Sequence, residues 1–124
     1  MGKHVLIVDD SATMRKIVMR SIRQAGIEVA DFQEAGDGVE GMKAVESARF
    51  DLILSDVNMP NMNGLEFVKS VRAKLADAAP PIVMITTEAS DEVLSELRAN
   101  GAKGYLKKPF TPEKLQEVIG PLLK

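Results

Sequence analysis

The sequence contains no cysteine and a single histidine, and each of these features excludes a class of site. Without cysteine the chain can form neither a disulfide framework nor a reactive thiolate. One histidine cannot supply the set of imidazole ligands that a typical zinc site requires. His4 directly precedes the apolar run Val5–Val8, and we interpret it as a residue at the entry of a strand.

The chain also lacks a surplus of basic residues and a long apolar run. Its 16 lysines and arginines and 18 aspartates and glutamates give a net charge of −2, whereas nucleic-acid binders normally carry a basic surplus. No apolar stretch approaches the length of a membrane span. Gly2 is not followed by the Ser or Thr at position 6 that favours myristoylation. We therefore expect a soluble cytoplasmic protein that binds neither nucleic acid nor membrane.

The residues that are present indicate one globular domain over residues 1–124. Hydrophobic residues make up 45% of the chain and charged residues 27%, an ordinary globular mixture. A chain of this length buries roughly two-thirds of its unfolded surface when it folds. The sequence has no composition break, repeat or linker that would divide it.

Short apolar runs alternate with helical apolar stripes along the whole chain. Strands are expected at 5–8, 27–32, 51–55, 82–86 and 104–107. Helices are expected at 11–25, at 37–48 with an Asp37/Glu40 capping box, from 65 to 75, at 90–99, and after Thr111 as N-cap with Pro112 at the first helical position. This alternation predicts an α/β sandwich, with a parallel sheet covered by helices on both faces.

Polar side chains follow four of the five expected strands. They are Asp9 and Asp10 after the first, Asp56 after the third, Thr86 and Thr87 after the fourth, and Lys107, Lys108 and Pro109 after the fifth. The second strand delivers nothing comparable. In an open parallel sheet, ligands bind outside the carboxyl ends of the strands. We therefore expect these side chains to meet at one edge of the sheet.

Three carboxylates at one place need a cation, because like charges a few ångströms apart repel and raise one another's pKa. Mg²⁺ usually takes one or two carboxylates, several waters and a phosphate oxygen, and Mn²⁺ is an alternative ion. Such an incomplete cage suits a site that receives a phosphoryl group. Taken singly, an Asp-Asp pair can be a helix cap, a lysine a solvated charge and a Thr-Thr pair a strand former. Their meeting at one sheet edge is what points to a site.

Four stretches of the chain carry a family resemblance: VLIVDDSATMRKIV, DLILSDVNMPNMNGLEF, IVMITTEA and GAKGYLKKPFTPEKL. The chain resembles a response-regulator receiver domain across essentially its full length. Among receivers it is most similar to the stand-alone chemotaxis regulators, since nothing follows residue 124. The resemblance, and not the periodicity, implies a flavodoxin-like (βα)5 three-layer sandwich whose five parallel strands have the order 2-1-3-4-5.

The resemblance also implies a role for each acidic residue. Asp56 would be the phosphoacceptor, a carboxylate nucleophile that forms an aspartyl phosphate. Asp10 and Asp56 would bind Mg²⁺ directly, and Asp9 would act mainly through a bound water. Asn58 would contribute its backbone carbonyl to the metal and lie beside the phosphoryl group.

The remaining site residues would contact the phosphoryl group. Lys108 matches the family lysine because it directly precedes Pro109, and the peptide between them is expected to be cis. Lys107 is then a surface charge or an auxiliary. Thr86 would donate a hydrogen bond to a phosphoryl oxygen, and the amide of Thr87 would help to hold the same group.

A conformational switch is implied as well. An aromatic residue at the place of Tyr105 swings inward in this family when the threonine, here Thr86, moves toward the phosphate. The output surface would be the 90–123 face, formed by residues 90–100, 103–107 and 111–123. Asn58 and Glu88 would set the rate at which the acyl phosphate hydrolyses, and Val57 offers no polar contact to the site.

The resemblance thus implies a monomeric phosphoacceptor with self-catalysed phosphorylation and slow autodephosphorylation, not a turnover enzyme. Its partners would be a histidine kinase as phosphodonor, an output protein such as a flagellar motor switch component, and a phosphatase. A single-domain phosphorelay intermediate would use the same site. A haloacid-dehalogenase-like phosphatase would need a second carboxylate where Asn58 stands. A flavodoxin-like cofactor binder would need a glycine- or hydroxyl-rich loop where Asp9 and Asp10 stand.

Overall fold

A five-stranded parallel sheet with helices on both faces dominates the computed structural model, which describes residues 2–87 and 90–123. The strands are β1 Lys3–Val8, β2 Val29–Ala35, β3 Leu52–Asp56, β4 Ile82–Thr86 and β5 Gly104–Lys107. The α-helices are α1 Ala12–Gln24, α2 Gly38–Ser47, α3 Gly64–Leu75, α4 Asp91–Ala99 and α5 Pro112–Ile119. Short 3₁₀ turns follow α3 and α5, at η1 Ala76–Ala78 and η2 Gly120–Leu123.

The strand order is β2-β1-β3-β4-β5 with every neighbouring pair parallel, which confirms the predicted flavodoxin-like fold. The chain runs from β1 outward to β2 and then returns across β1 to β3. The order therefore reverses between β1 and β3, and a crevice opens outside the carboxyl ends of these two strands. Val8 pairs with Ser55 in this register, so the residues that follow β1 arrive beside Asp56.

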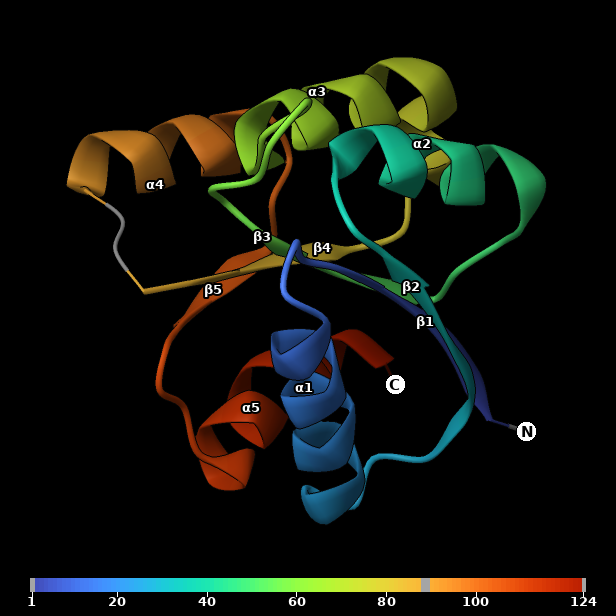
Figure 1. Ribbon diagram of the computed structural model, residues 1–124, viewed down its shortest axis with the longest axis vertical. Coiled ribbons are helices and arrows are strands. Elements are labelled where there is room, and N and C mark those ends of the chain that lie inside the picture. The colour runs from blue at the N-terminus through green and yellow to red at the C-terminus, as the bar shows by residue number, and fades with distance from the viewer. Residues whose placement is uncertain (1, 88–89, 124) are drawn as a thin grey trace.

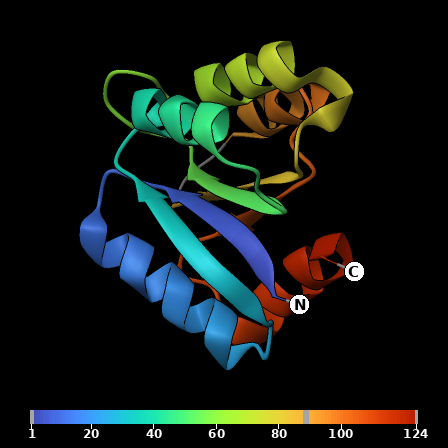
Figure 2. The same cartoon turned by 90° about the vertical axis from the view of Figure 1, so that its right-hand side faces the viewer.

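The helices form two layers that sandwich the sheet (Figure 1). Helices α2, α3 and α4 lie on one face, and α1 and α5 lie on the other, as the turned view also shows (Figure 2). Each layer has its own buried cluster: Leu6, Val8, Ile53, Phe67 and Met84 belong to the first, and Val5, Ile7, Leu54, Val83 and Leu115 to the second. Central strands that are buried on both faces need continuous apolar runs, which explains the sequences of β1, β3 and β4.

Side chains cap the start of all five α-helices of the described chain. The cap residues are Ser11, Asp37, Asn63, Ser90 and Thr111, and each accepts a hydrogen bond from the amide three residues on. Such a cap satisfies one of the amides that has no partner within the helix. The predicted N-cap Thr111 with Pro112 behind it is confirmed.

The predicted capping box of α2 is only half formed. The Glu40 amide donates to Asp37 Oδ1 at 2.8 Å, but Glu40 Oε1 accepts from the amide of Gly36 at 3.0 Å instead of that of Asp37. The reciprocal pair lies at α3, where Asn63 and Glu66 each accept from the other's amide.

Strand β2 begins and ends later than the predicted 27–32, at Val29–Ala35. The reason is the end of α1, where Gly26 has φ of 80° and the amide of Ile27 donates to the carbonyl of Ile22 at 3.3 Å. These features belong to a Schellman motif, in which the backbone of Gly26 and Ile27 closes the helix and cannot yet pair with β1.

Candidate functional site

Three carboxylates gather where β1 and β3 end. Asp9 and Asp10 follow β1, and Asp56 is the last residue of β3. One oxygen from each of these three residues lies within 4.8 Å of the others. The structure thus brings together the three acidic residues predicted to meet. Their oxygens are the hard ligands that Mg²⁺ and Mn²⁺ prefer, so the donor set fits a divalent cation.

Lys108 reaches this cluster from the end of β5. Its Nζ lies 3.2 Å from Asp9 Oδ2 and 3.6 Å from Asp56 Oδ2. Its backbone amide donates to the carbonyl of Thr86 at 2.7 Å, which ties the end of β5 to the end of β4. The Lys108–Pro109 peptide is cis, as predicted. Lys107 points elsewhere, toward a hollow that it lines with Tyr105.

Burial raises the pKa of Asp56 above its ordinary value, and the negative charge of Asp9 raises it further. The Lys108 ammonium acts in the opposite direction, as do the amides of Val57 and Asn58. Burial is the largest of these effects, so the ionised form of Asp56 is costly. A cation or a covalent modification at this carboxylate would relieve that cost.

The two neighbouring aspartates differ in how many contacts they already make. Asp9 is only 4% exposed, its Oδ1 accepts from the amide of Ser11 at 2.9 Å, and its Oδ2 faces Lys108. Asp10 is exposed, and within residues 2–87 and 90–123 its carboxylate has no hydrogen bond or ion pair. Asp10 can therefore meet a metal directly, whereas Asp9 is held by the protein.

A hollow of about 570 Å³ opens at Val57 and Asn58, the two residues that follow Asp56. Asn58, Thr87 and Tyr105 line it together with Thr86, whose own side chain is 1% exposed. Tyr105 is 38% exposed, and the Arg98 guanidinium lies 5.9 Å from the centroid of its ring. Of the predicted phosphate-binding and switch residues, Asn58, Thr86, Thr87 and Tyr105 thus share one rim, whereas Lys108 does not line it. Glu88 lies outside the described residues.

The loop after Asp56 is held in place at both ends. A Cβ at position 64 would lie 2.4 Å from the Asp56 carbonyl oxygen, and the Gly64 amide donates to the carbonyl of Val57 at 2.7 Å. Asn61, with φ of 65°, donates from Nδ2 to Asp37 Oδ2 at 2.6 Å. The Glu40 amide and then Asn61 lower the pKa of Asp37. The loop is therefore tied to the start of α2.

Sequence reasoning missed two residues near the carboxylates. Arg15 donates from Nη1 to the carbonyl of Asp9 at 2.6 Å and from Nε to Glu34 Oε1 at 2.9 Å. Arg15 is in α1 and Glu34 is in β2, so no local spacing pattern indicates that they meet.

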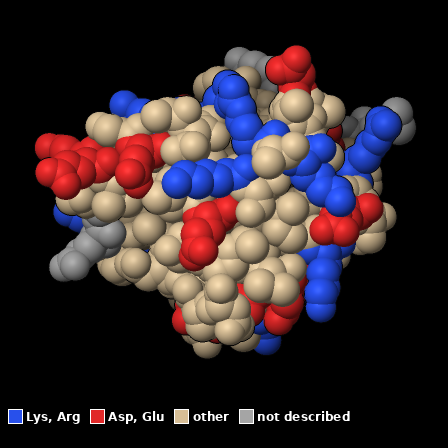
Figure 3. All heavy atoms as spheres, turned by 90° about the horizontal axis from the view of Figure 1, so that it is seen from above, with Lys and Arg blue, Asp and Glu red and all other residues tan. Residues whose placement is uncertain are grey.

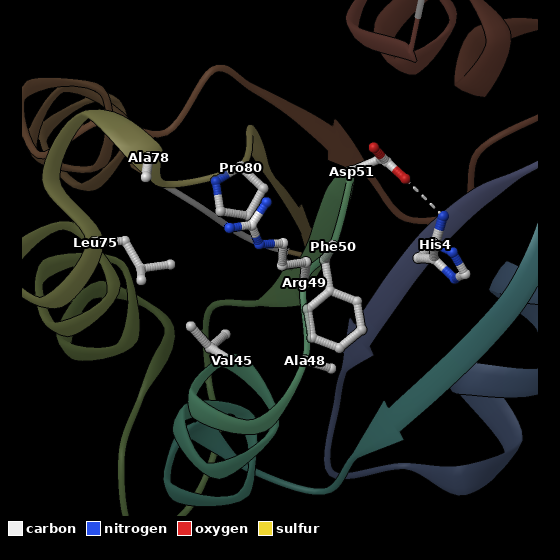
Figure 4. Close-up of a pocket in the computed structure, with 9 residues that line it drawn as sticks. All are labelled: His4, Val45, Ala48, Arg49, Phe50, Asp51, Leu75, Ala78 and Pro80. Atoms are coloured by element: carbon white, nitrogen blue, oxygen red, sulfur yellow. Dashed lines mark hydrogen bonds between the residues drawn. The ribbon is translucent and has the colours of Figure 1, made fainter.

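A second hollow, of about 510 Å³, lies at the opposite edge of the sheet (Figure 4). It is lined by His4, Val45, Ala48, Arg49, Phe50, Asp51, Leu75, Ala78 and Pro80. Asp51 already accepts a hydrogen bond from the His4 amide at 2.9 Å. The C-terminal ends of α2 and α3 adjoin this hollow, and their partial negative charge disfavours an anionic ligand. It holds none of the predicted site residues.

The sequence profile of the response regulator receiver domain matches residues 5–120. The chain belongs to this receiver family. It is similar to the chemotaxis protein CheY1 of Helicobacter pylori, with 43% identity over 96% of this chain and 95% of that protein. It is also similar to CheY-3 of Vibrio cholerae, with 38% identity over 97% of this chain and 91% of that protein.

Solved structures agree with the receiver assignment. Chemotaxis protein CheY4 of Vibrio cholerae superposes with a TM-score of 0.86 at 45% sequence identity, covering 99% of this chain and 100% of that one. Receiver domains bind Mg²⁺ at an acidic cluster, and Asp9, Asp10 and Asp56 form such a cluster here. None of the described helices is long and apolar enough to cross a bilayer.

Proposed function

We propose that this receiver is a chemotaxis response regulator that accepts a phosphoryl group on Asp56 from a histidine kinase, in a reaction that depends on Mg²⁺. One observation carries the proposal: Asp56 lies at a sheet edge with two further carboxylates and a lysine ammonium 3.6 Å from its Oδ2. The names of the relatives supply the chemotaxis role.

Asp56 is the best candidate for the nucleophile among the three carboxylates. Asp9 is only 4% exposed, and Lys108 Nζ lies closer to its Oδ2, at 3.2 Å, than to Asp56 Oδ2, at 3.6 Å. Asp10 is exposed and lies outside the rim formed by Thr86 and Thr87. Asp56 adjoins Val57 and Asn58, which line the hollow where a phosphoryl donor can enter.

In the proposed reaction an oxygen of Asp56 attacks the phosphorus of a phosphohistidine. The P–N bond breaks, its electron pair returns to the imidazole nitrogen, and that nitrogen takes up a proton from solvent. A Mg²⁺ ion held by Asp10, Asp56 and the Asn58 carbonyl, with Asp9 acting through water, would supply charge neutralisation. Lys108 then pairs with a phosphoryl oxygen, and Thr86 and the Thr87 amide hold the group from the hollow.

The output surface in this proposal is the 90–123 face, comprising α4, β5 and α5. Movement of Thr86 toward the phosphoryl group would leave room for Tyr105 to turn inward from its exposed position. Acidic side chains gather at the α4 end of the helical face drawn in Figure 3, where Asp91, Glu92 and Glu96 are exposed. An output partner such as a motor switch component would complement this charge with basic residues.

Two other outcomes use the same geometry. A phosphorelay intermediate would pass the phosphoryl group to a histidine instead of binding an output partner. A phosphatase of the haloacid-dehalogenase type would turn over small phosphoesters, but Asn58 stands where that chemistry needs a second carboxylate. We propose self-catalysed phosphorylation with slow autodephosphorylation, so repeated turnover of phosphoesters by the purified chain would contradict the proposal.

Labelling with phosphoramidate tests the acceptor directly. The wild-type chain should incorporate one phosphoryl group with Mg²⁺ and none in EDTA, and Asp56→Asn should incorporate none. Asp77→Asn is the matched control, because Asp77 is an exposed carboxylate in η1. Undiminished labelling of Asp56→Asn would overturn the assignment. A pull-down with and without beryllofluoride, a stable phosphoryl mimic, would then identify the output partner.

A further inference from the structure

We propose that Arg15 is a positioning residue for the metal site, which holds the peptide between Asp9 and Asp10 while Glu34 fixes its guanidinium. The inference rests on the proposed function, since it concerns the same acidic cluster. Arg15 Nη1 donates to the Asp9 carbonyl at 2.6 Å, and Arg15 Nε donates to Glu34 Oε1 at 2.9 Å. One side chain therefore links α1, the end of β1 and β2.

The carbonyl that Arg15 holds belongs to the peptide unit that joins the two aspartates. A turn of this unit changes ψ of Asp9 and φ of Asp10 together, because a peptide unit is planar and turns as one body, so fixing its carbonyl restrains how the two residues move relative to each other. The other polar atoms of Asp9 are also engaged: its amide donates to Ala35, Oδ1 accepts from Ser11 and Oδ2 faces Lys108. With the contact from Arg15 to the carbonyl, every polar atom of Asp9 has a partner.

Asp10, in contrast, has no side-chain partner in the described part of the chain. Its carboxylate is therefore aimed by the backbone alone. A shift of the Asp9–Asp10 peptide would move this carboxylate away from the other two, although no bond of Asp10 itself would break. Arg15 thus acts on Asp10 through the peptide, without touching its carboxylate.

Through Glu34, strand β2 also contributes a residue to the surroundings of the acidic cluster, which the sequence pattern of β2 does not indicate. It lies near the carboxyl end of β2, one residue before Ala35, whose carbonyl accepts from the Asp9 amide. The Arg15 side chain is 17% exposed and that of Glu34 is 39% exposed, so the guanidinium is partly shielded from solvent while its partner stays at the surface. Partners in the outer shell of a metal site orient its ligands in this way.

The direction in which Mg²⁺ affinity changes when Arg15 is replaced distinguishes a positioning role from a purely electrostatic one. Arg15 is a cation near an anionic site, so its charge alone opposes the binding of Mg²⁺. Removing that charge should tighten Mg²⁺ binding if electrostatics dominate. Removing a positioning contact should weaken it.

The experiment is a calorimetric titration of the full chain with Mg²⁺, without phosphodonor and at physiological ionic strength. We expect Arg15→Gln to weaken Mg²⁺ binding by about tenfold. Arg15→Lys keeps the charge but loses the planar guanidinium that donates to two partners at once. Its Mg²⁺ affinity should therefore resemble that of Arg15→Gln and not that of the wild type. Lys16→Gln is the matched control, because Lys16 is an exposed cation on the same helix, and its Mg²⁺ affinity should stay equal to the wild type or rise slightly.

Glu34→Gln should weaken Mg²⁺ binding less than Arg15→Gln. The double variant should bind no more weakly than Arg15→Gln alone, because Glu34 acts through Arg15. Amide chemical shifts of Asp10 in the metal-free protein give a readout that does not need the ion, and they should move in Arg15→Gln but not in Lys16→Gln. Unfolding in urea with EDTA confirms that each variant is folded under the titration conditions.

Mg²⁺ binding by Arg15→Gln that equals or exceeds that of the wild type would overturn the positioning role. The proposed function fails in a different way, if the wild-type chain binds no Mg²⁺ or if Asp56→Asn is still labelled. A wild-type chain that binds Mg²⁺, with Arg15→Gln unchanged, leaves the acceptor intact and removes only Arg15 from the site.

Discussion

The ammonium nitrogen of Lys108 lies 3.2 Å from Asp9 Oδ2, although 99 positions of sequence separate the two residues. Strands β3 and β4 lie between β1 and the edge strand β5, so this contact spans the carboxyl ends of four of the five strands. The side chains are 13% and 5% exposed, respectively. In the metal-free protein, Lys108 is thus the main cation that compensates the buried charge of Asp9 and Asp56.

Lys108→Ala should destabilise the metal-free protein, because it leaves Asp9 buried without its cation. Breaking a largely buried pair by removing one partner costs about 3 kcal/mol. Mg²⁺ should restore much of this loss, so the increase in unfolding free energy on adding Mg²⁺ should be larger in Lys108→Ala than in the wild type. Urea denaturation in EDTA and in Mg²⁺ measures both quantities.

Lys107→Ala provides the control for that measurement, since Lys107 is exposed and borders the hollow instead of the carboxylates. Its stability should stay within about 0.5 kcal/mol of the wild type. Equal losses in the two lysine variants would show that Lys108 does not compensate the acidic cluster.

The raised pKa of Asp56 predicts how stability without divalent ions depends on pH. Its folded pKa exceeds the ordinary value of 3.8, so between the two values the folded state binds more protons than the unfolded state. Stability contributed by this group is therefore present at low pH and is lost as pH rises through the folded pKa. Asp56→Asn should accordingly be more stable than the wild type at neutral pH in EDTA, with a difference that shrinks in acid.

Thermal unfolding of the two proteins across an acidic-to-neutral pH series, each sample with EDTA, measures this difference. Asp77→Asn, at an exposed site, should follow the wild type at every pH. A gap between Asp56→Asn and the wild type that widens in acid would contradict the direction of the pKa shift.

Gly64→Ala should disturb the acceptor loop, because a Cβ there would lie 2.4 Å from the Asp56 carbonyl and 2.8 Å from the Val57 Cα. Both neighbours are backbone atoms that cannot turn aside, so we expect a loss of about 2 kcal/mol in unfolding free energy and slower labelling of Asp56. Gly36→Ala is the control, since its nearest neighbour is the flexible Glu40 carboxylate at 3.4 Å. Similar losses in both variants would count against this account.

Much of the fold could be predicted because most strands are short runs with a recognisable sequence pattern. The bounds predicted for the runs 82–86 and 104–107 are those of the structure, since each run ends at a polar residue. The helix start after Thr111 followed from local capping chemistry. Strand β2 was predicted at the wrong bounds because it is an edge strand in which four of seven positions are exposed, which weakens its hydrophobic pattern, and because the end of α1 occupies Gly26 and Ile27.

The acidic site was predictable for a similar reason: parallel strands bring their carboxyl ends to one edge, so Asp9 and Asp56 had to meet once their strands were assigned. Arg15 and Glu34 were missed because their contact depends on where α1 and β2 lie in the folded chain. Glu40 was paired with the wrong amide for a different reason: Asp37 and Gly36, three and four residues before it, both have amides within reach of its side chain. Contacts fixed by tertiary structure leave no local pattern.

The last prediction concerns Tyr105, which is the only tyrosine in a chain without tryptophan. Intrinsic fluorescence of the protein therefore reports this one ring, now 38% exposed and 5.9 Å from the Arg98 guanidinium. If phosphorylation turns the ring inward, beryllofluoride with Mg²⁺ should change the emission of the wild type. Thr86→Ala should remove the hydroxyl that couples the two events, so we expect at least a severalfold smaller change although the mimic still binds.

Lys108→Ala should likewise bind or accept the phosphoryl group while leaving Tyr105 in place, because its ammonium is the group that would draw the β5 end toward the phosphoryl oxygen. Lys103→Ala, at an exposed position just before β5, should respond like the wild type. An emission change in Thr86→Ala or Lys108→Ala as large as that of the wild type would show that Tyr105 responds to the acidic site by another route. It would then remove Thr86 and Lys108 from the switch, while leaving Asp56 as the acceptor.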